Sequence, residues 1–292
     1  MVALTRAGGV QTAVLEDEND TVPSFFFDNV REAAAFCDWV PRHLPEMQAA
    51  TATTTRHGKL NSAYCYQSGR QVMLHLAFAT GDAHGMNMIM KATDAVCRWV
   101  RESYPTAGSL LFSGMCSEKK ASSLLLTRGK GKRVVAGALL PHNIMRMYLH
   151  VTADQMMHMW QSTIVGHLHA GAVGFNGHVA NGLTAIFIAT GQDVANVVNS
   201  ASAVTYFEYV DEGLYVSVTL PSLTIATVGG GTGLPSQKEA LDIMGCHGTG
   251  KARKLAEIIA AAVLGGEISI GAAIASDEFV KAHEHYGRNR PK

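Results

Sequence analysis

The sequence lacks several features that would assign it to a simple class of protein. Its 292 residues carry 24 Lys and Arg against 24 Asp and Glu, so the formal net charge is zero. Without a basic excess, a protein that binds nucleic acid mainly through phosphate contacts is excluded. Only 16% of residues are charged and 47% are apolar, which excludes an intrinsically disordered chain. The apolar surplus instead indicates a large buried core and favours an oligomer.

Uninterrupted apolar runs and paired cysteines are also scarce. The longest apolar stretch, residues 258–275, is interrupted by Gly265, Gly266 and Glu267, so we expect no transmembrane helix. The N-terminal segment has no long apolar core after its basic residue, which argues against a signal peptide. The five cysteines are scattered, without CxxC or another metal-ligand spacing. We therefore expect reduced thiols, no metal site and a cytoplasmic location.

The first third of the chain alternates between strand and helix patterns. Strands are predicted over residues 10–16, 51–67 and 71–80, and helices over residues 28–50 and 86–104. This β-α-β-β-α order needs one more strand to complete a split-βαβ, ferredoxin-like sandwich, and residues 109–113 can supply it. We place this small domain at residues 8–108.

From about residue 106 onward the patterns are mainly helical. Helices are predicted over residues 141–161, 178–190 and 252–285, the last dividing at its two adjacent glycines, and one strand is predicted over residues 214–220. Residues 1–7 and 109–292 then form a helix-rich large domain. The predicted fold class is α+β, with the small domain inserted into the large one.

The densest glycine motif is TGDAHGMNM, which begins at Thr80 and joins a predicted strand to a predicted helix. Gly81 and Gly85 permit a tight turn and a close approach of the backbone to a ligand. The N-terminus of the following helix offers free N–H groups to a phosphate. Asp82 and Asn87 are equally suited to capping a helix. The segment is therefore either a phosphate-binding loop or a plain turn.

Other segments also leave two interpretations open. Lys119 and Lys120 either belong to a solvated loop or direct an ammonium group at a developing oxyanion. Asp193, which follows an apolar helix, is either a helix N-cap or a buried carboxylate. The triple glycine at residues 229–231 is either a hinge or a phosphate-approaching loop. For His283, pairing with a helix dipole is the simpler explanation.

Together, the motifs GDAxGMNM, SGxxxxKK, FNxHxAN, TAIFIATGQD, TVGGGT and VKxH occur in the order found in the catalytic part of HMG-CoA reductase. The chain resembles this family over nearly its whole length, and the lysine in the SGxxxxKK loop resembles the eukaryotic-type class. The resemblance implies a ferredoxin-like NADPH-binding domain inside a helical substrate domain. It also implies reduction of HMG-CoA to mevalonate with two NADPH. A homodimer or higher homo-oligomer, with sites shared across the interface, is implied as well.

The resemblance also implies roles for individual residues. Lys119 would stabilise the thioester oxyanion, Asp193 would tune the proton network, and His283 would protonate the leaving CoA thiolate. The implied cofactor positions are Arg56, Asp82, His84, Gly85, Met86 and Asn87. The implied positions in the substrate pocket are Arg6, Ser113, Glu118, Lys120, Ser162, His167, His169, His178 and Asn181.

Several positions depart from the family pattern. The sequence starts close to residues 4–6, downstream of the segment that holds the family's catalytic glutamate, so we expect an N-terminally truncated, divergent homologue. Ser162 stands where the family has a lysine for the substrate carboxylate, and His84 replaces a methionine of the cofactor loop. His167 and His169 stand where the family has small residues.

These departures lead to three functional hypotheses. The one we favour is a rewired enzyme without hydride transfer or cofactor, which guides an acid/base or cyclisation step on a small molecule in natural-product biosynthesis. The alternative is NADPH-dependent reduction of HMG-CoA, impaired by loss of the glutamate. The third is a regulatory or resistance partner of a full-length reductase. None of the three requires a nucleic acid or a membrane as partner.

Overall fold

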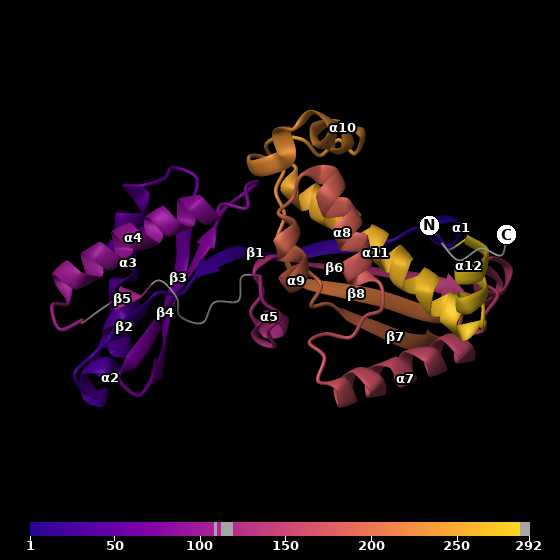
Figure 1. Ribbon diagram of the computed structural model, residues 1–292, viewed down its shortest axis with the longest axis horizontal. Helices are drawn as coiled ribbons and strands as arrows, with labels where there is room; N and C mark the ends of the chain where they lie inside the picture. Colours follow the sequence, from indigo (N-terminus) through magenta and orange to yellow (C-terminus); the bar gives the residue numbers. More distant parts are fainter. Residues whose placement is uncertain (108–109, 112–118, 287–292) are drawn as a thin grey trace.

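The computed structural model describes residues 1–107, 110–111 and 119–286, which form two lobes joined by one long strand, β1 (Gln11–Thr21) (Figure 1). The small lobe contains β2 (Ser24–Phe26), α2 (Val30–Trp39), η1 (Val40–His43), α3 (Leu44–Ala52), β3 (Lys59–Ser68), β4 (Gln71–Ala79), α4 (Met86–Ser103) and β5 (Leu110–Leu111). The large lobe contains α1 (Val2–Arg6), α5 (Leu124–Thr127), β6 (Gly131–Pro141), α6 (His142–Ile144), η2 (Met145–Leu149), α7 (Ala153–Ala170), α8 (Val179–Thr190), η3 (Val194–Asn196), α9 (Val197–Ser200), β7 (Val204–Val210), β8 (Gly213–Leu223), η4 (Gly230–Gly233), α10 (Pro235–Ile243), α11 (Ala252–Ala275) and α12 (Phe279–Tyr286).

The small lobe is an antiparallel sheet packed against helices. Its strand order is β5-β2-β4-β3, and its elements follow in β-α-β-β-α-β order along the chain, which is the split-βαβ topology. A core separate from that of the large lobe is centred on Phe25, Phe36 and Phe78. The first strand of this motif is β2, not residues 10–16 as the sequence analysis predicted. Pro23, which has no N–H to donate to the ladder, separates β2 from β1.

β1 is shared between two sheets. Residues 11–18 pair with β6 of the large lobe, and residues 19–21 pair with β4 of the small lobe. A domain boundary at residue 8 therefore assigns to the small domain a segment that pairs within the large-lobe sheet.

The large lobe is built on a second antiparallel sheet with the order β1-β6-β8-β7, and α11 crosses it (Figure 1). The large lobe is helix-rich, as expected, but most of its sheet was not predicted, because only part of β8 was recognised as a strand. In β6 the inward-facing residues are Val134, Ala136, Ala138 and Leu140, all buried. When the alternating residues of a strand include alanine and glycine, which have low strand propensity, the sequence predicts the strand only weakly.

Two of the predicted helices are interrupted. Over residues 28–50, Pro41 and Pro45 begin a 3-10 turn and a new helix, since proline cannot continue the preceding hydrogen-bond ladder. α3 then extends to Ala52, so β3 starts at Lys59, later than predicted. Over residues 141–161, the π-helix η2 ends at His150, whose φ of 57° is left-handed.

α11 runs unbroken through Gly265 and Gly266, where the sequence analysis predicted a division. A Cβ atom on Gly266 would lie 2.2 Å from Nδ1 of His178, so this glycine permits close packing against the start of α8. α11 is long and apolar enough to cross a membrane by length and composition. In this fold Leu255, Ile259 and Val263 of α11 instead belong to the buried core of the large lobe.

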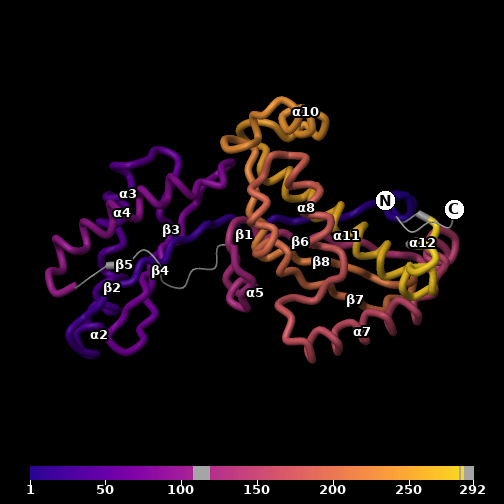
Figure 2. The backbone as a smooth tube through the Cα atoms, in the orientation of Figure 1, coloured from indigo at the N-terminus to yellow at the C-terminus, as the bar shows by residue number. Residues whose placement is uncertain are grey.

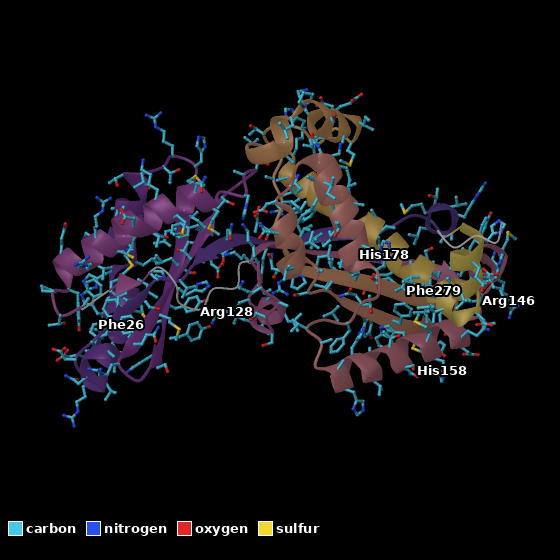
Figure 3. The ribbon with its side chains drawn as sticks, viewed as in Figure 1. Phe26, Arg128, Arg146, His158, His178 and Phe279 are labelled. Carbon is cyan, nitrogen blue, oxygen red and sulfur yellow. The ribbon has the colours of Figure 1, made fainter. Side chains whose placement is uncertain are left out.

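A buried charged cluster joins the lobes where β1 passes between them. Nε2 of His75 on β4 lies 2.9 Å from Oδ2 of Asp20 on β1, and the ammonium of Lys130 contacts the other carboxylate oxygen. Tyr64 stacks on His75 with ring centroids 4.3 Å apart, and the Arg128 guanidinium lies 4.0 Å from the centroid of Tyr64. Figure 3 places Arg128 at this junction. This cluster was not predicted from the sequence.

Candidate active site

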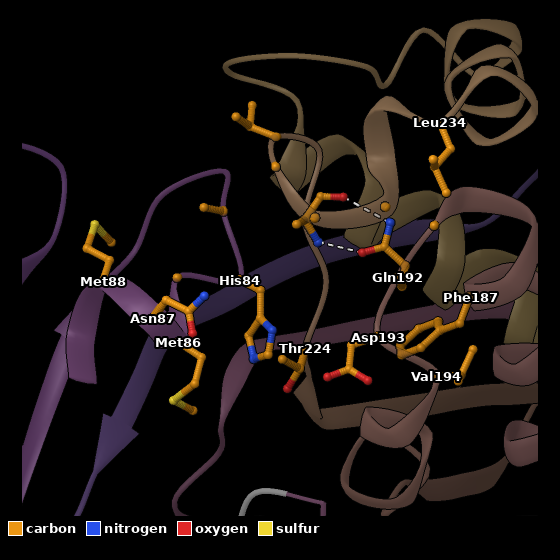
Figure 4. A pocket seen from close by; sticks show the side chains of 18 of the residues that line it. His84, Met86, Asn87, Met88, Phe187, Gln192, Asp193, Val194, Thr224 and Leu234 are labelled. Carbon is orange, nitrogen blue, oxygen red and sulfur yellow. Dashed lines mark hydrogen bonds between the residues drawn. The ribbon is translucent and has the colours of Figure 1, made fainter. Parts of the chain in front are cut away.

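A cavity of about 740 Å³ lies where the two lobes meet. Its small-lobe wall is the loop between β4 and α4, with the first turn of α4 (Figure 4). Its large-lobe wall comprises Lys119, the end of α8 with the following loop, and the glycine-rich segment before α10. The cavity therefore brings together the glycine motif, one lysine of the paired-lysine motif, the Gly-Gln-Asp motif and the triple glycine.

The β4–α4 loop owes its shape to two glycines and two side-chain hydrogen bonds. Gly81 and Gly85 have φ angles of 64° and 77°, and a Cβ atom on Gly85 would lie 2.7 Å from Thr80. Thr80 donates to the carbonyl of Ala83 (2.9 Å), and Asn19 of β1 donates to the carbonyl of His84 (2.9 Å). Met86 and Asn87 open α4 at the cavity wall, so the positive end of the helix dipole faces the cavity.

Asp82 does not line this cavity. Its carboxylate accepts hydrogen bonds from the backbone N–H groups of Gly250, Lys251 and Ala252, at 2.7, 3.1 and 3.0 Å, and so caps the N-terminus of α11. Burial raises the pKa of Asp82, but these three hydrogen bonds outweigh it and hold the pKa below its ordinary value. Asp82 was predicted to contact the cofactor. The structure instead places its side chain where the β4–α4 loop meets the N-terminus of α11.

The centre of the large-lobe wall is the ion pair between Lys119 and Asp193. Nζ of Lys119 lies 3.0 Å from Oδ2 of Asp193. The backbone of Lys119 is left-handed, with φ 56°, and its N–H points to Oδ1 of the buried Asn199 at 3.4 Å. Asp193 also accepts from the N–H of Ala195 (3.1 Å) and the side chain of Asn196 (3.3 Å).

The carboxyl group of Asp193 is held in its ionised form. Partial burial raises its pKa, but the hydrogen bond from Lys119, the Ala195 N–H and the charges of Lys119 and His84 lower it by more. The pKa therefore lies below its ordinary value. A fixed carboxylate beside an ammonium can hold that ammonium toward a developing oxyanion in the cavity.

Gln192 positions Asp193 by pairing with the backbone of the neighbouring strand end. Its side chain donates to the carbonyl of Ala226 (3.0 Å) and accepts from the N–H of Ala226 (2.7 Å), as Figure 4 shows. The preceding Gly191 has φ 68°, and a Cβ atom there would lie 2.3 Å from the carbonyl oxygen of Gly231. Two glycine-containing loops thus meet backbone to backbone. No role was predicted for Gln192 or Asn199, because their hydrogen-bond partners are distant in the chain.

Arg56, another predicted cofactor contact, lies outside this cavity. It lines a second cavity of about 620 Å³ with Lys59 and residues of α3. A Cβ atom on Gly58, in the same cavity, would lie 3.1 Å from the end of the Met88 side chain, and Met88 lines the first cavity. The two cavities are therefore neighbours across Met88.

Most of the predicted substrate residues lie elsewhere in this chain. Asn181 is exposed on the face of α8 that continues to Ile188 at the cavity, whereas the His178 ring packs against Gly182 and Gly266. Figure 3 shows His178 beside α11. The backbone N–H of His178 donates to Glu267 at 2.6 Å.

The remaining predicted residues lie still farther from the cavity or outside the description. Ser162 and His169 are exposed on α7, and His167 is half-buried near Phe175. Arg6 is on α1 and the backbone of His283 on α12, at the end of the large lobe away from the small lobe (Figure 2). The His283 side chain, Ser113 and Glu118 lie outside the described residues. Lys120 is exposed beside Lys119.

Comparisons with known proteins agree on one family. The family model for hydroxymethylglutaryl-coenzyme A reductase matches residues 1–288. The 3-hydroxy-3-methylglutaryl-coenzyme A reductase of Pyrococcus abyssi is 42% identical over 98% of this chain and 72% of its own length. Reductase 1 of Dictyostelium discoideum is 34% identical over 98% of this chain and 54% of its own length. The structure of a class II 3-hydroxy-3-methylglutaryl-CoA reductase from Streptococcus pneumoniae bound to NADPH has a TM-score of 0.75 at 20% identity, covering 94% of this chain and 76% of its own.

These relatives correct two expectations. The rewired, non-redox interpretation was wrong, since relatives at 38–42% identity over 98% of this chain are named reductases. The eukaryotic-type assignment gains no support, because the Pyrococcus protein is more similar to this chain than the Dictyostelium one. With a family match over nearly every residue and a fold shared with solved reductases, the chain belongs to the hydroxymethylglutaryl-coenzyme A reductase family.

Proposed function

We propose that this chain is an oxidoreductase that reduces HMG-CoA to mevalonate with NADPH. The observation that carries the proposal is the Lys119–Asp193 ion pair, which shares one cavity with the glycine-shaped N-terminus of α4. The ammonium of Lys119 can stabilise an oxyanion, and the N-terminus of α4, on the opposite wall, can bind an anion. Hydride transfer from a phosphate-bearing cofactor to a carbonyl requires both functions in one cavity.

The residues of the β4–α4 loop fit such a cofactor. Gly85 has no side chain where the backbone would approach the ligand, and Met86 and Asn87 border the cavity at the positive end of α4. NADPH, when bound, supplies the hydride. Arg56 and Lys59, in the neighbouring cavity, bear the positive charge suited to a cofactor phosphate.

Lys119 is the group suited to polarise the substrate carbonyl. Its ammonium stabilises negative charge on the carbonyl oxygen as the hydride arrives, and Asp193 keeps the ammonium in place. Removing one such preorganised donor typically costs a factor of about 10² to 10³ in kcat.

We also propose that the working form is a homodimer. α8 is almost wholly apolar, yet one face of it is exposed, namely Ala180, Asn181, Thr184, Ala185 and Ile188. Ile188 borders the cavity, and Asn181 lies about 10 Å farther along the same face, at 1.5 Å per residue. A second copy covering this face would bury its exposed apolar side chains beside the cavity. A monomer by light scattering at assay concentration would contradict this.

The domain division remains part of the proposal. Two separate hydrophobic cores support a small cofactor domain within residues 8–108 and a large domain formed by residues 1–7 and 109–292, with β1 shared. We also propose a cytoplasmic location, on the ground of the scattered cysteines in the sequence.

The proposal is tested by following NADPH absorbance with purified protein and HMG-CoA. We expect oxidation of NADPH that depends on HMG-CoA and yields mevalonate, detected by mass spectrometry. A folded protein that binds both compounds but forms no mevalonate would overturn the proposal.

A further inference from the structure

Asp82 lies at the point where the two walls of the active-site cavity meet. The residues that follow it, 83–88, line the cavity from the small lobe, and residues 228–231 line it from the large lobe. The carbonyl oxygen of Asp82 accepts hydrogen bonds from the N–H groups of Thr227 (2.8 Å) and Val228 (3.3 Å), where the large-lobe segment begins. Asp82 therefore joins the two lining segments through its backbone.

The carboxylate of Asp82 makes a second connection to the large lobe. Its three hydrogen bonds come from the N–H groups of residues 250–252, at the end of α11 that lies toward the small lobe (Figure 1). The buried ammonium of Lys132, on β6, donates to the carbonyl of the preceding Gly81 at 3.3 Å. The start of the β4–α4 loop is thus attached to β6, to α11 and to the segment that follows β8.

The glycine-rich part of the large-lobe wall is held at its other end by the large lobe itself. A Cβ atom on Gly231 would lie 2.7 Å from the carbonyl oxygen of Gly191, two residues before Asp193. Between the two ends, Gly229 and Gly230 have φ angles of 80° and 57°, and a Cβ atom on either would meet no described residue within 4 Å. The position of this segment therefore depends on its two anchored ends, of which Asp82 holds one.

We propose that Asp82 is a positioning residue for the reduction, which sets the spacing between the cofactor wall and the ion-pair wall of the cavity. This inference rests on the proposed function and deepens it. Hydride transfer needs the reacting atoms in a fixed orientation, about 3 to 3.5 Å apart. A small displacement of one wall relative to the other therefore lowers kcat without removing any group that binds a ligand. Asp82 acts through the two segments that it joins.

The kinetic test uses three substitutions of Asp82. D82A should lower kcat by about 10 to 100 times, while the dissociation constants of NADPH and HMG-CoA stay within about threefold of wild type. In D82N, kcat should stay within about threefold of wild type, because asparagine caps helices about as well as aspartate. D82S, whose shorter side chain reaches fewer of the N–H groups, should give an intermediate kcat and serves the same test should D82A fail to fold.

Asn29 provides the matched control. Its side chain caps α2 by accepting hydrogen bonds from the N–H groups of Arg31 and Glu32, both at 3.0 Å, within the small lobe. N29A removes a helix cap of the same kind away from the junction of the walls, so its kcat should equal that of wild type. A kcat loss in D82A no larger than in N29A, or a loss that is wholly weaker binding of NADPH, would overturn the proposal.

Amide hydrogen exchange gives a readout without turnover. The N–H groups of Thr227 and Val228 bond to the carbonyl of Asp82, which D82A retains, so they report whether the carboxylate holds the walls together. Their exchange should be about 2 to 30 times faster in D82A, the factor that corresponds to loss of a helix cap, and unchanged in N29A. Unchanged exchange in D82A refutes the coupling even in an active reductase. Faster exchange in D82A, with no mevalonate formed by the wild type, supports the coupling and refutes the reaction.

Discussion

Asp20 and Lys130 form an ion pair that is almost completely buried, at the junction where β1 passes from one lobe to the other. The side chains are 9% and 3% exposed, and His75 reaches the same carboxylate from the small lobe at 2.9 Å. The pair thus contributes to holding the lobes in the arrangement that closes the active-site cavity. An uncompensated charge left in such a position is strongly destabilising.

The first prediction concerns stability against acid. Burial raises the pKa of Asp20, but His75 and Lys130 outweigh it and lower the pKa from 3.8 to about 2. Because the folded-state value is the lower one, this stabilisation is complete above about pH 4 and is lost as the pH falls toward 2. It amounts to about 2 kcal/mol.

Urea unfolding from pH 6 down to pH 2 measures this effect. D20N should be less stable at neutral pH by about 3 to 5 kcal/mol and should lose about 2 kcal/mol less than wild type on acidification. D94N is the matched control, because Asp94 pairs with Arg98 in solvent and is half-exposed. Identical acid dependence in wild type and D20N would show that Asp20 is not the linked group.

The second prediction separates catalysis from stability at Lys119. K119M should lower kcat by about 10² to 10³, because it removes the preorganised donor. The free energy of unfolding should change by less than about 1 kcal/mol, since Lys119 and Asp193 are 44% and 39% exposed. K91A, at an exposed position of α4, should leave both quantities near the wild-type values. A K119M protein with wild-type kcat would remove Lys119 from the mechanism.

The third prediction concerns the cofactor loop. G85A introduces a Cβ atom 2.7 Å from Thr80 at a φ of 77°, so the loop must shift and the affinity for NADPH should fall by about tenfold. The matched variant G69A also has a positive φ, 59°, but meets nothing within 4 Å. G69A should therefore lose about 1 kcal/mol of stability and bind NADPH normally in a fluorescence titration. Equal NADPH affinities in the two variants would contradict this account of the loop.

The fourth prediction concerns the two adjacent glycines of α11. G266A places a methyl group 2.2 Å from His178 and should cost about 1 to 3 kcal/mol of stability by overpacking. G166A, in an exposed part of α7 with no neighbour within 4 Å, should instead stabilise by about 0.5 to 1 kcal/mol, as alanine favours a helix. Thermal unfolding of both variants checks the contrast. Stabilisation by G266A would show that the α8–α11 contact is looser than described.

Local patterns predicted much of the small lobe but less of the large one. The β3–β4 hairpin and α4 follow from alternation and helical periodicity. The predicted positions of β4 and α4 agree with the structure, whereas β3 begins at Lys59, later than predicted. β7, with the sequence VTYFEYV, carries a strong strand signal and was nevertheless not predicted. β6 was missed because a strand rich in alanine, glycine and valine gains its stability from its partners in the sheet. The same dependence on neighbours explains α11, whose glycines looked like a break and instead serve helix packing.

The candidate site shows a similar division. The motifs around Gly85, Lys119 and Asp193 could be selected from the sequence, and the structure brings them to one cavity. The carboxylate of Asp82 was assigned to the cofactor, yet it binds the N-terminus of α11, some 170 positions away. No local signal distinguishes a carboxylate that faces a ligand from one that caps a distant helix.

The sequence by itself determined the family, through ordered motifs whose residue types the chemistry requires, and it determined the neutral charge and the apolar content of the chain. It did not determine which of the three hypothesised functions those motifs serve, and the preference for a rewired role was wrong. The tertiary structure decided which candidates meet. It paired Lys119 with Asp193, brought His84 to the same cavity, and placed His178 between helices. The physical reason is that charge coupling and side-chain packing depend on the distance between residues in space. Those distances are set by the pairing of strands and the packing of helices that are far apart in the chain.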